Sequence, residues 1–318
     1  MQGHFDDFKV VKYSKEYYEQ WNDFVAKSKN GTFLFHRDFM EYHSDRFEDF
    51  SLLIFQRNKL QAILPANKSG QEIYSHQGLT YGGVLLPNNI SVVKVFSVFE
   101  VIQKYCKQIN ISKITIREIP EFYCDKPTSE ISFIIGQKYS LFQRQMVLAI
   151  DFEKGFSIHK TKLKHYKKGR DVGFEIKEDD TFDEFWINVL QPRLLERFNS
   201  KPVHRLEEIT LLKRNFPKNI KQFNIYLGNQ ILAGITIFEN KNVVKSQYGA
   251  TTSEGERFRA LDYLFLFLID KYKEEGKKFF SMGTISDNSI KGYNEGLLKQ
   301  KEEFGCNVYL QDSFSIDL

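Results

Sequence analysis

The sequence has little cysteine and no long apolar segment. Its 318 residues include only Cys106, Cys124 and Cys306, and none of the three forms a C-x-x-C pair. We therefore expect reduced, buried thiols and no metal, because a disulfide framework or zinc site needs paired or clustered cysteines. The longest strongly apolar run, Tyr263–Ile269, is far shorter than the ~20 residues that cross a bilayer. We expect no membrane insertion.

Charge and composition exclude several other classes of protein. The first nine residues are polar and lack the apolar segment of a signal peptide, so we expect a cytoplasmic location. The 45 Lys and Arg exceed the 41 Asp and Glu by only four, which does not by itself indicate a nucleic-acid partner but suits an anionic substrate. With 42% hydrophobic residues and 30 Phe, the chain is neither disordered nor linker-like. Its length predicts two domains or one large one.

The predicted elements occur twice in the same order. Each half contains a β-hairpin, a third strand, a helix and a further strand, which predicts a duplicated α/β unit, although coincidence among common elements is the alternative. The first set is Phe50–Phe55, Leu60–Ala66, Ile73–Leu86, Ser91–Gln108 and Lys113–Arg117, and the second covers residues 223–282. Other predicted elements are a helix over Asp38–Asp45, strands at Ile131–Gly136 and Leu141–Ile150, a basic helix at Thr161–Gly173, and a helix at Phe182–Phe198 interrupted at Pro192.

Four segments match known motifs in order along the chain. They are the basic stretch Lys162–Gly173 before a strand, Ile231–Gly234, Lys278–Gly283, and Gly296–Gly305 with its closing lysine and Phe-Gly. Together with the element order they resemble the Gcn5-related N-acetyltransferase (GNAT) fold, and two such units in tandem resemble the Fem family of aminoacyl transferases and its acyltransferase relatives. The resemblance implies an α/β (α+β) fold of two tandem GNAT-like acyl-CoA N-acyltransferase units. Each unit is expected to be a mixed sheet flanked by helices, with residues 1–155 on the acceptor side and residues 156–318 on the donor side.

One departure from the GNAT pattern concerns the donor. GNAT enzymes hold the coenzyme A pyrophosphate with a Q/R-x-x-G-x-G/A loop at a helix N-terminus. The equivalent stretch here, Thr251–Ala260, contains one glycine and places Glu254 and Glu256 beside the phosphate position, although two arginines offset them. The Fem family also lacks this loop, since its donor is aminoacyl-tRNA. We expect acyl-CoA or aminoacyl-tRNA as co-substrate, with the departure favouring aminoacyl-tRNA. The predicted donor-binding residues are Tyr248, Gly255, Arg257 and Arg259.

Two segments of the first half are candidates for the acceptor site. Residues 33–47 mix His, Arg and Tyr with phenylalanines, and residues 75–83 contain three glycines within a β-like run. Arginine offers bidentate bonds to anions, and glycine allows close approach of a ligand, whereas helix capping and a structural bulge are the alternatives. The acceptor would carry its amine on a cell-wall precursor, an amino sugar or a nucleotide-linked sugar. The predicted substrate-binding residues are His36, Arg37, Tyr42, His43, Arg46, His76 and Tyr81.

The sequence offers no nucleophile supported by a base. It has no G-x-S-x-G elbow and no cysteine with a local histidine pattern, so we predict direct attack of the acceptor amine, without a covalent intermediate. Asp287 and Tyr293 follow a strand end where an acid or base is expected. Lys301 matches the family's closing lysine, and the resemblance implies that it steadies the donor or leaving group.

Two other functions remain open from the sequence. The degenerate phosphate loop is compatible with a catalytically inactive GNAT-fold module that only binds a ligand. The cluster of basic residues at 162–170 is compatible with an RNA-binding protein, or with contacts to tRNA or coenzyme A phosphates, although a solvated helix face is the simpler interpretation.

Overall fold

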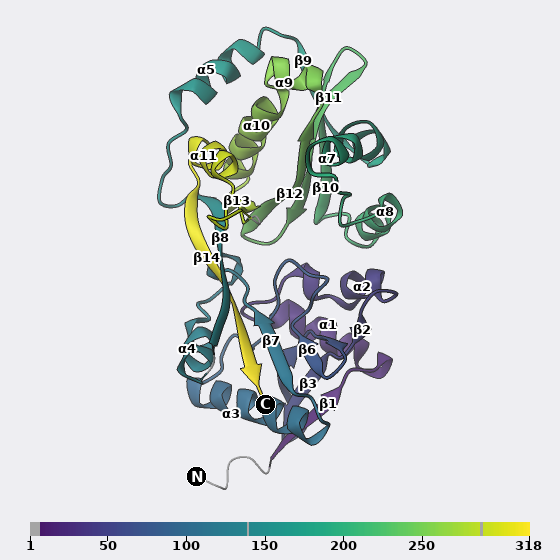
Figure 1. Cartoon of the computed structure of the whole chain (residues 1–318), viewed down its shortest axis with the longest axis vertical. Helices are drawn as coiled ribbons and strands as arrows, with labels where there is room; N and C mark the ends of the chain where they lie inside the picture. The colour runs from purple at the N-terminus through teal and green to yellow at the C-terminus, as the bar shows by residue number, and fades with distance from the viewer. Residues whose placement is uncertain (1–6, 139, 287–288) are drawn as a thin grey trace. The chain divides into compact units, whose positions relative to one another are not determined.

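The structure is a computed structural model that describes residues 7–138, 140–286 and 289–318 (Figure 1). The chain forms two compact units, Met1–Gln145 with Leu310–Leu318, and Met146–Tyr309. Two long strands, β8 (Ser140–Asp151) and β14 (Asn307–Asp317), each begin in one unit and end in the other. Residues 310–318, which the sequence analysis assigned to the second half, thus pack within the first unit.

The first unit contains two sheets. The smaller sheet is antiparallel in the order β1-β3-β4, and the larger has the order β2-β5-β6-β7-β14, in which only the β6–β7 pair is parallel. The strands are β1 (Phe8–Lys12), β2 (Glu48–Asp49), β3 (Leu52–Gln56), β4 (Lys59–Leu64), β5 (Asn67–Ser69), β6 (Glu72–Tyr74) and β7 (Lys113–Arg117). The helices are α1 (Tyr18–Lys27), α2 (Arg37–Met40), α3 (Val92–Gln108) and α4 (Ser129–Lys138), with 3-10 turns at Lys15–Tyr17, Phe33–Phe35, Glu41–His43 and Glu121–Tyr123.

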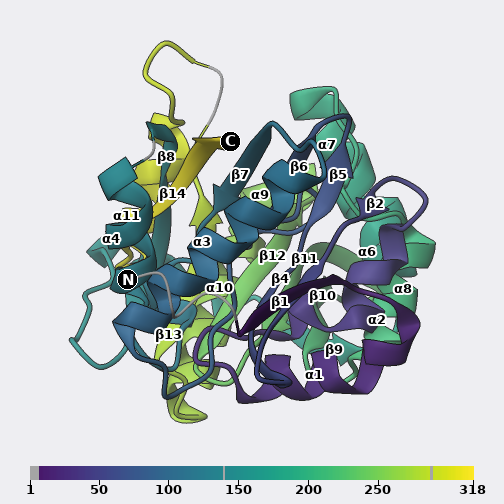
Figure 2. The same cartoon turned by 90° about the horizontal axis from the view of Figure 1, so that it is seen from below.

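Helix α3 closes the core of the first unit. The Ser91 hydroxyl accepts the Lys94 N–H and so caps its start, as expected for a serine at this position. Apolar residues at helical spacing, from Val95 to Cys106, are buried against the strands, and α4 packs beside α3 (Figure 2). The predicted strand at Ile131–Gly136 is wrong. Its β-branched residues lie on α4, where Ile131, Ile134 and Ile135 face the core at helical spacing.

The second unit is one mixed sheet with the order β8-β13-β12-β11-β10-β9, in which only the β12–β13 pair is parallel. Its strands are β9 (Phe174–Asp179), β10 (Ile220–Leu227), β11 (Gln230–Glu239), β12 (Val243–Thr251) and β13 (Phe279–Thr284). The helices are α5 (Lys160–Gly169), α6 (Asp183–Phe185), a π turn (Trp186–Leu190), α7 (Gln191–Phe198), α8 (Leu206–Asn215), α9 (Ser253–Phe258), α10 (Ala260–Glu274) and α11 (Glu295–Glu303).

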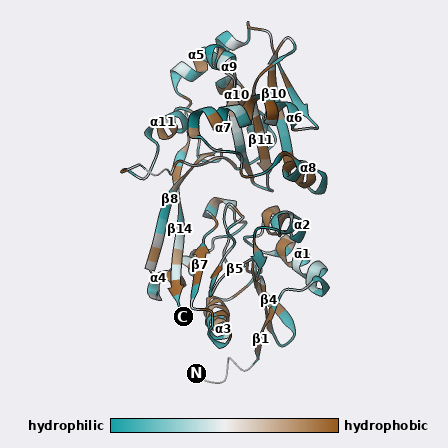
Figure 3. Ribbon diagram, turned by 45° about the vertical axis from the view of Figure 1, so that its right-hand side comes forward, coloured by the Kyte–Doolittle hydropathy of each residue, from teal (hydrophilic) through white to brown (hydrophobic). Residues whose placement is uncertain are grey.

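Helix α10 covers the apolar face of this sheet. Leu264, Leu268 and Ile269 are fully buried and belong to the same core as Ile235 and Phe280 (Figures 1 and 3). Burial of about 25 cal/mol per Å² of apolar surface is the main force that holds the helix to the strands.

Pro192 does not interrupt the helical segment as predicted. The π turn Trp186–Leu190 directly precedes it, and α7 continues from Gln191 to Phe198. Proline cannot donate to the carbonyl four residues earlier, and the wider turn accommodates the missing bond. The basic helix was predicted correctly as α5, which ends at Gly169.

Within α5, Lys162 is buried although its neighbours are exposed. Its ammonium contacts Asp262 Oδ2 at 2.7 Å and Glu303 Oε2 at 3.7 Å, and lies 4.5 Å from the centre of the Phe304 ring. This lysine therefore joins α5 to α10 and α11 and is not available to phosphates. The exposed lysines of the helix are Lys160, Lys164, Lys167 and Lys168.

Replacing Lys162 by methionine is expected to destabilise the second unit by ~3 kcal/mol, the low end for breaking a buried ion pair, because Glu303 stays partly exposed. Urea unfolding monitored by circular dichroism measures the change. Lys164→Met, on the exposed side of the same helix, is the matched control and should change stability by less than ~0.5 kcal/mol. Equal effects of the two substitutions would contradict a structural role for Lys162.

Candidate active site

The second unit contains an opening between its two parallel strands. β12 and β13 pair only from Val243–Phe279 to Lys245–Ser281, whereas β12 continues to pair with β11 as far as Thr251. β13 in turn continues along β8 to Thr284. The strands therefore separate after Lys245, and backbone groups of both face the gap. We call this gap, bounded by residues 245–249 of β12 and 281–284 of β13, the strand opening.

A β-bulge lies at the strand opening. On β11, Ile237 pairs with Ser246 and Thr236 pairs with Tyr248, so Gln247 is an extra residue in β12. A bulge leaves the extra residue outside the ladder and turns its backbone away from the regular direction. The backbone N–H of Gln247 is thus a candidate donor to a carbonyl oxygen held in the opening.

Two lysine side chains meet at Gly283 beside the opening. The Lys301 ammonium, reaching from α11, donates to the carbonyls of Thr284 at 2.8 Å and Gly283 at 3.3 Å. The Lys245 side chain lies against the other side of Gly283: a Cβ placed on that glycine would be 3.9 Å from Lys245 Cε. Gly283 has a φ of +74°, which favours glycine. Burial lowers the pKa of Lys301 to about 8.

The other residues predicted near the opening are Tyr248, Tyr293 and Asp287, and their positions differ. The Tyr248 hydroxyl lies 2.6 Å from His204 Nδ1 and accepts the His204 N–H at 3.2 Å, and burial raises the pKa of Tyr248 to about 12. Tyr293 is half-buried and forms a backbone bridge with Ser286. Asp287 lies outside the described residues. Lys301 and Tyr248 are therefore the predicted residues placed at the opening.

A cationic pocket of about 240 Å³ lies at the far end of β12. Arg193 and Arg197 of α7 reach into it, together with Arg259, which joins α9 to α10 in a left-handed conformation with a φ of +57°. The Glu256 carboxylate accepts hydrogen bonds from both Arg193 and Arg197. We call this the arginine pocket. Its lining contains three cationic side chains and two carboxylates, those of Glu256 and Asp262.

The structure gives Gly255 and Arg257 other contacts. A Cβ on Gly255 would lie 2.3 Å from the Leu232 carbonyl oxygen, so the glycine is needed for packing of α9 against β11. Its N–H is donated to the Thr252 hydroxyl, the cap of α9. Arg257 is exposed and pairs with Glu254. Of the predicted donor-binding residues, Arg259 and Gly255 line the arginine pocket.

The first unit has a polar pocket of its own, of about 290 Å³. It lies where the parallel β6–β7 pairing ends at Tyr74 and Thr115. The remaining lining residues are Ser75, His76, Gln77, Arg117, Gln143 and Ser313. We call this the first-unit pocket. Burial, with the neighbouring His43 and Arg37, lowers the pKa of His76 to about 3, so this ring is neutral at pH 7.

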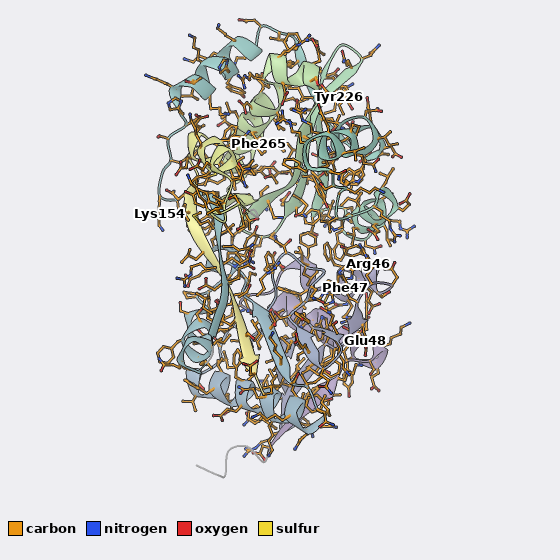
Figure 4. The ribbon with its side chains drawn as sticks, viewed as in Figure 1. Arg46, Phe47, Glu48, Lys154, Tyr226 and Phe265 are labelled. Carbon is orange, nitrogen blue, oxygen red and sulfur yellow. The ribbon has the colours of Figure 1, made fainter. Side chains whose placement is uncertain are left out.

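Several predicted acceptor residues gather next to this pocket. The rings of His43 and His76 stack with centres 5.1 Å apart, and Tyr42 packs on His43 at 4.2 Å. The Arg46 guanidinium lies 5.6 Å from the centre of the Tyr42 ring, on the segment that leads through Phe47 into β2 (Figure 4). Of this group, only His76 lines the first-unit pocket.

Three other predicted acceptor residues have packing roles. Arg37 is 2% exposed, stacks 3.7 Å from the centre of the Tyr13 ring and pairs with Glu41 and Asp49. His36 caps α2 by accepting the Asp38 N–H. Tyr81 is 1% exposed and its hydroxyl donates to Thr32.

The sequence analysis did not predict four basic residues of these sites, although each of them has a recognisable signal in the sequence. Arg193 and Arg197 recur at i and i+4 after Pro192, so they share one face of a helix. Lys245 is the one cation in the otherwise uncharged run Val243–Thr251. Arg117 ends the apolar strand Lys113–Arg117.

Within the described residues, no group of three or more His, Cys, Asp or Glu side chains is placed to hold a metal ion. Across the same part of the chain, every helix is too short or too polar to span a bilayer.

A parallel strand pair joined by a long helix occurs once in each unit, through α3 between β6 and β7 and through α10 between β12 and β13, and this defines a tandem GNAT fold. Solved structures agree. FemX superposes with a TM-score of 0.69 at 12% identity, covering 98% of this chain and 97% of that chain. The C-terminal domain of a protein from Agrobacterium fabrum described as a lysylphosphatidylglycerol synthetase gives 0.62 at 11% identity, covering 94% and 91%. A tandem GNAT protein from the clavulanic acid biosynthesis pathway gives 0.54 at 10% identity, covering 98% of both chains.

The chain thus has a Fem-like tandem GNAT fold, as the sequence resemblance predicted. No protein-family model matches the sequence, and no curated protein matches it. At these identities the likeness establishes the fold, and the function must be argued from the site.

Proposed function

We propose that the protein is an N-acyl or aminoacyl transferase that joins an acyl group from a phosphate-bearing donor to the amine of a small anionic acceptor. The observation that carries this proposal is that β12 has the strand opening at one end and the arginine pocket at the other. The names of the structural neighbours, which include a lysylphosphatidylglycerol synthetase domain and a tandem GNAT protein, support an acyl transfer reaction.

The distance between the two places restricts the donor. Gln247, which would hold the donor carbonyl, and Gly249 to Thr251, which line the arginine pocket, are two to four residues apart on an extended strand, which corresponds to ~7–13 Å at about 3.3 Å per residue. A donor with phosphate at the arginine pocket and its reactive carbonyl at the opening needs an arm of at least this length. Acyl-CoA and the 3′ end of an aminoacyl-tRNA both provide one.

The groups at the opening suit direct attack by an amine. The Gln247 N–H stabilises the oxyanion that forms when the amine adds to the donor carbonyl, and fixed donors of this kind act where charge develops. The Lys301 ammonium stabilises negative charge on the leaving oxygen or sulfur. Tyr248, whose hydroxyl is held by His204, positions the bulge.

The first-unit pocket is proposed to bind the acceptor through an anionic group. The Arg117 side chain lines it without a carboxylate partner among the described residues, and the pocket wall is otherwise polar. His76, neutral at pH 7, can accept or donate one hydrogen bond. An acidic or phosphorylated amine, such as a cell-wall precursor or a nucleotide-linked sugar, fits this lining.

Arg193→Ala and Arg197→Ala together are expected to weaken donor binding, raising the donor KM by ~10–100-fold, since charge-assisted hydrogen bonds contribute ~1.5–3 kcal/mol. Initial rates at varied donor concentration measure this. Arg214→Ala, on the exposed face of α8, is the matched control and should leave KM unchanged. Loss of kcat alone, with donor KM intact, would contradict a binding role for the arginine pocket.

Arg117→Ala is expected to raise the acceptor KM by ~10-fold or more while leaving the donor KM unchanged, because it removes the cation from the first-unit pocket. Two-substrate kinetics separates the two constants. If the substitution changes the donor KM instead, the assignment of acceptor and donor to the two units is wrong.

The exposed lysines of α5 distinguish the two donor classes. Changing Lys164, Lys167 and Lys168 to alanine is expected to weaken binding of aminoacyl-tRNA and to lower the slope of log K against log salt, because each lost phosphate contact reduces counterion release. Acyl-CoA carries far fewer phosphates than tRNA, so its binding should depend much less on these lysines and on salt. Fluorescence titration with tRNA at several salt concentrations measures the slope. An unchanged slope, or no association of tRNA with the unaltered protein, would favour acyl-CoA.

A further inference from the structure

The lysine pair at the strand opening has no counter-ion within residues 7–138, 140–286 and 289–318. The Lys245 amine donates to the amide oxygen of Gln247, and its stem rests on Gly283. The Lys301 ammonium is occupied by two backbone carbonyls. No carboxylate among the described residues pairs with either amine, although carboxylates do pair with Lys162, Lys221 and Lys277 in the same unit.

Among the described residues, the groups recorded around Lys245 are uncharged or cationic. Gln247 of β12 accepts its hydrogen bond, Gly283 of β13 lies beside its stem, and the Lys301 ammonium of α11 is its charged neighbour. The Cys306 thiol near Lys301 is neutral, because burial raises its pKa to about 12. The two neighbouring ammonium ions, with no anion between them in the part of the chain that the structure describes, repel each other, and the repulsion is relieved when one of them loses its proton.

Of the two lysines, Lys245 is the one positioned to lose its proton. Lys301 keeps its proton because it donates to two carbonyls, which favour the charged form. Lys245 is the last residue of β12 that pairs with β13, so it borders the strand opening. Burial first, and then the neighbouring Lys301 ammonium, lower the pKa of Lys245 to about 7.

We propose that the neutral amine of Lys245 is the proton acceptor that deprotonates the attacking amine of the acceptor substrate. This inference rests on the proposed transferase function and adds a residue and a step to it. The acceptor ammonium gives one proton to Lys245, and the freed amine adds to the donor carbonyl, forming the new C–N bond and the oxyanion. When the C=O bond re-forms, the bond to the leaving oxygen or sulfur breaks. The second nitrogen proton passes to the leaving group, and Lys245 returns its proton to water.

The first test observes Lys245 without any reaction. In protein labelled with ¹³C-lysine, NMR titration of the side-chain Cε signals should show one lysine that titrates near pH 7, far below the usual value of ~10.4, and this signal should be absent from Lys245→Gln. Lys301→Gln should move the same titration to higher pH. If the Lys245 signal titrates with the exposed lysines, the proposal is overturned whatever the enzyme transfers.

The second test measures transfer. For the unaltered protein kcat/KM should rise with pH through about 7, since the neutral amine accumulates above its pKa. Lys245→Gln should lower kcat/KM by ~10²–10⁴-fold and remove this pH dependence. Lys245→Arg, which keeps a charge and cannot accept a proton, should be equally inactive, whereas Lys299→Gln on the exposed side of α11 should match the unaltered protein.

The outcomes separate the two proposals. Full activity of Lys245→Arg would overturn proton transfer and leave a charge at that position as the requirement, with the transferase function intact. If Lys245 titrates near pH 7 but no amide forms from either acyl-CoA or aminoacyl-tRNA, the transferase function is contradicted, and the proton-acceptor role with it.

Discussion

The site in the second unit depends on one feature of the sheet, which is that β12 and β13 pair over only three residues. If the pairing continued to Thr251, the backbone of Gln247 would be satisfied by β13, and no gap would remain for a donor. The bulge at Gln247 and the left-handed Gly283 both lie where the pairing stops, and they turn the strands apart. Each would cost stability in a regular sheet, and both are tolerated because α10 buries the apolar side of the same strands.

Cations in this unit are held in three distinct ways. Lys162 is buried against two carboxylates and acts as a structural link. Arg193 and Arg197 share the carboxylate of Glu256, which is partly exposed and so can be displaced by a stronger anion such as phosphate. Lys301 and Lys245 have neutral hydrogen-bond partners, two carbonyls and the Gln247 amide, among the described residues. The lysine at the packing interface thus has a structural role, whereas the cations of the pocket and of the opening are the ones proposed for anion binding and proton transfer.

The sequence predicted the elements better than their side-chain contacts. The hairpin β10–β11, helix α10 and the basic helix α5 were evident from local periodicity, which reports burial on one face. The helix at Ser129–Lys138 was missed because a run rich in isoleucine satisfies a strand pattern as well as a helix face. Arg37 was predicted to bind substrate because its neighbours are polar, but Asp49 and Tyr13, which lie at a distance in the chain, enclose it. Such contacts depend on tertiary packing and leave no periodic signal.

Because tertiary contacts leave no periodic signal, the two halves look equivalent in sequence although the residues at their sites differ chemically. In each unit the parallel pairing ends at a defined residue, Tyr74 in the first and Lys245 in the second. The Tyr74 hydroxyl donates to Glu72, which further raises its pKa, so it keeps its proton at neutral pH. A tyrosine in that state offers no base, whereas a lysine flanked by a second ammonium does. In the proposed reaction, the residue at the last paired position therefore gives proton transfer to the second unit and leaves the first for binding.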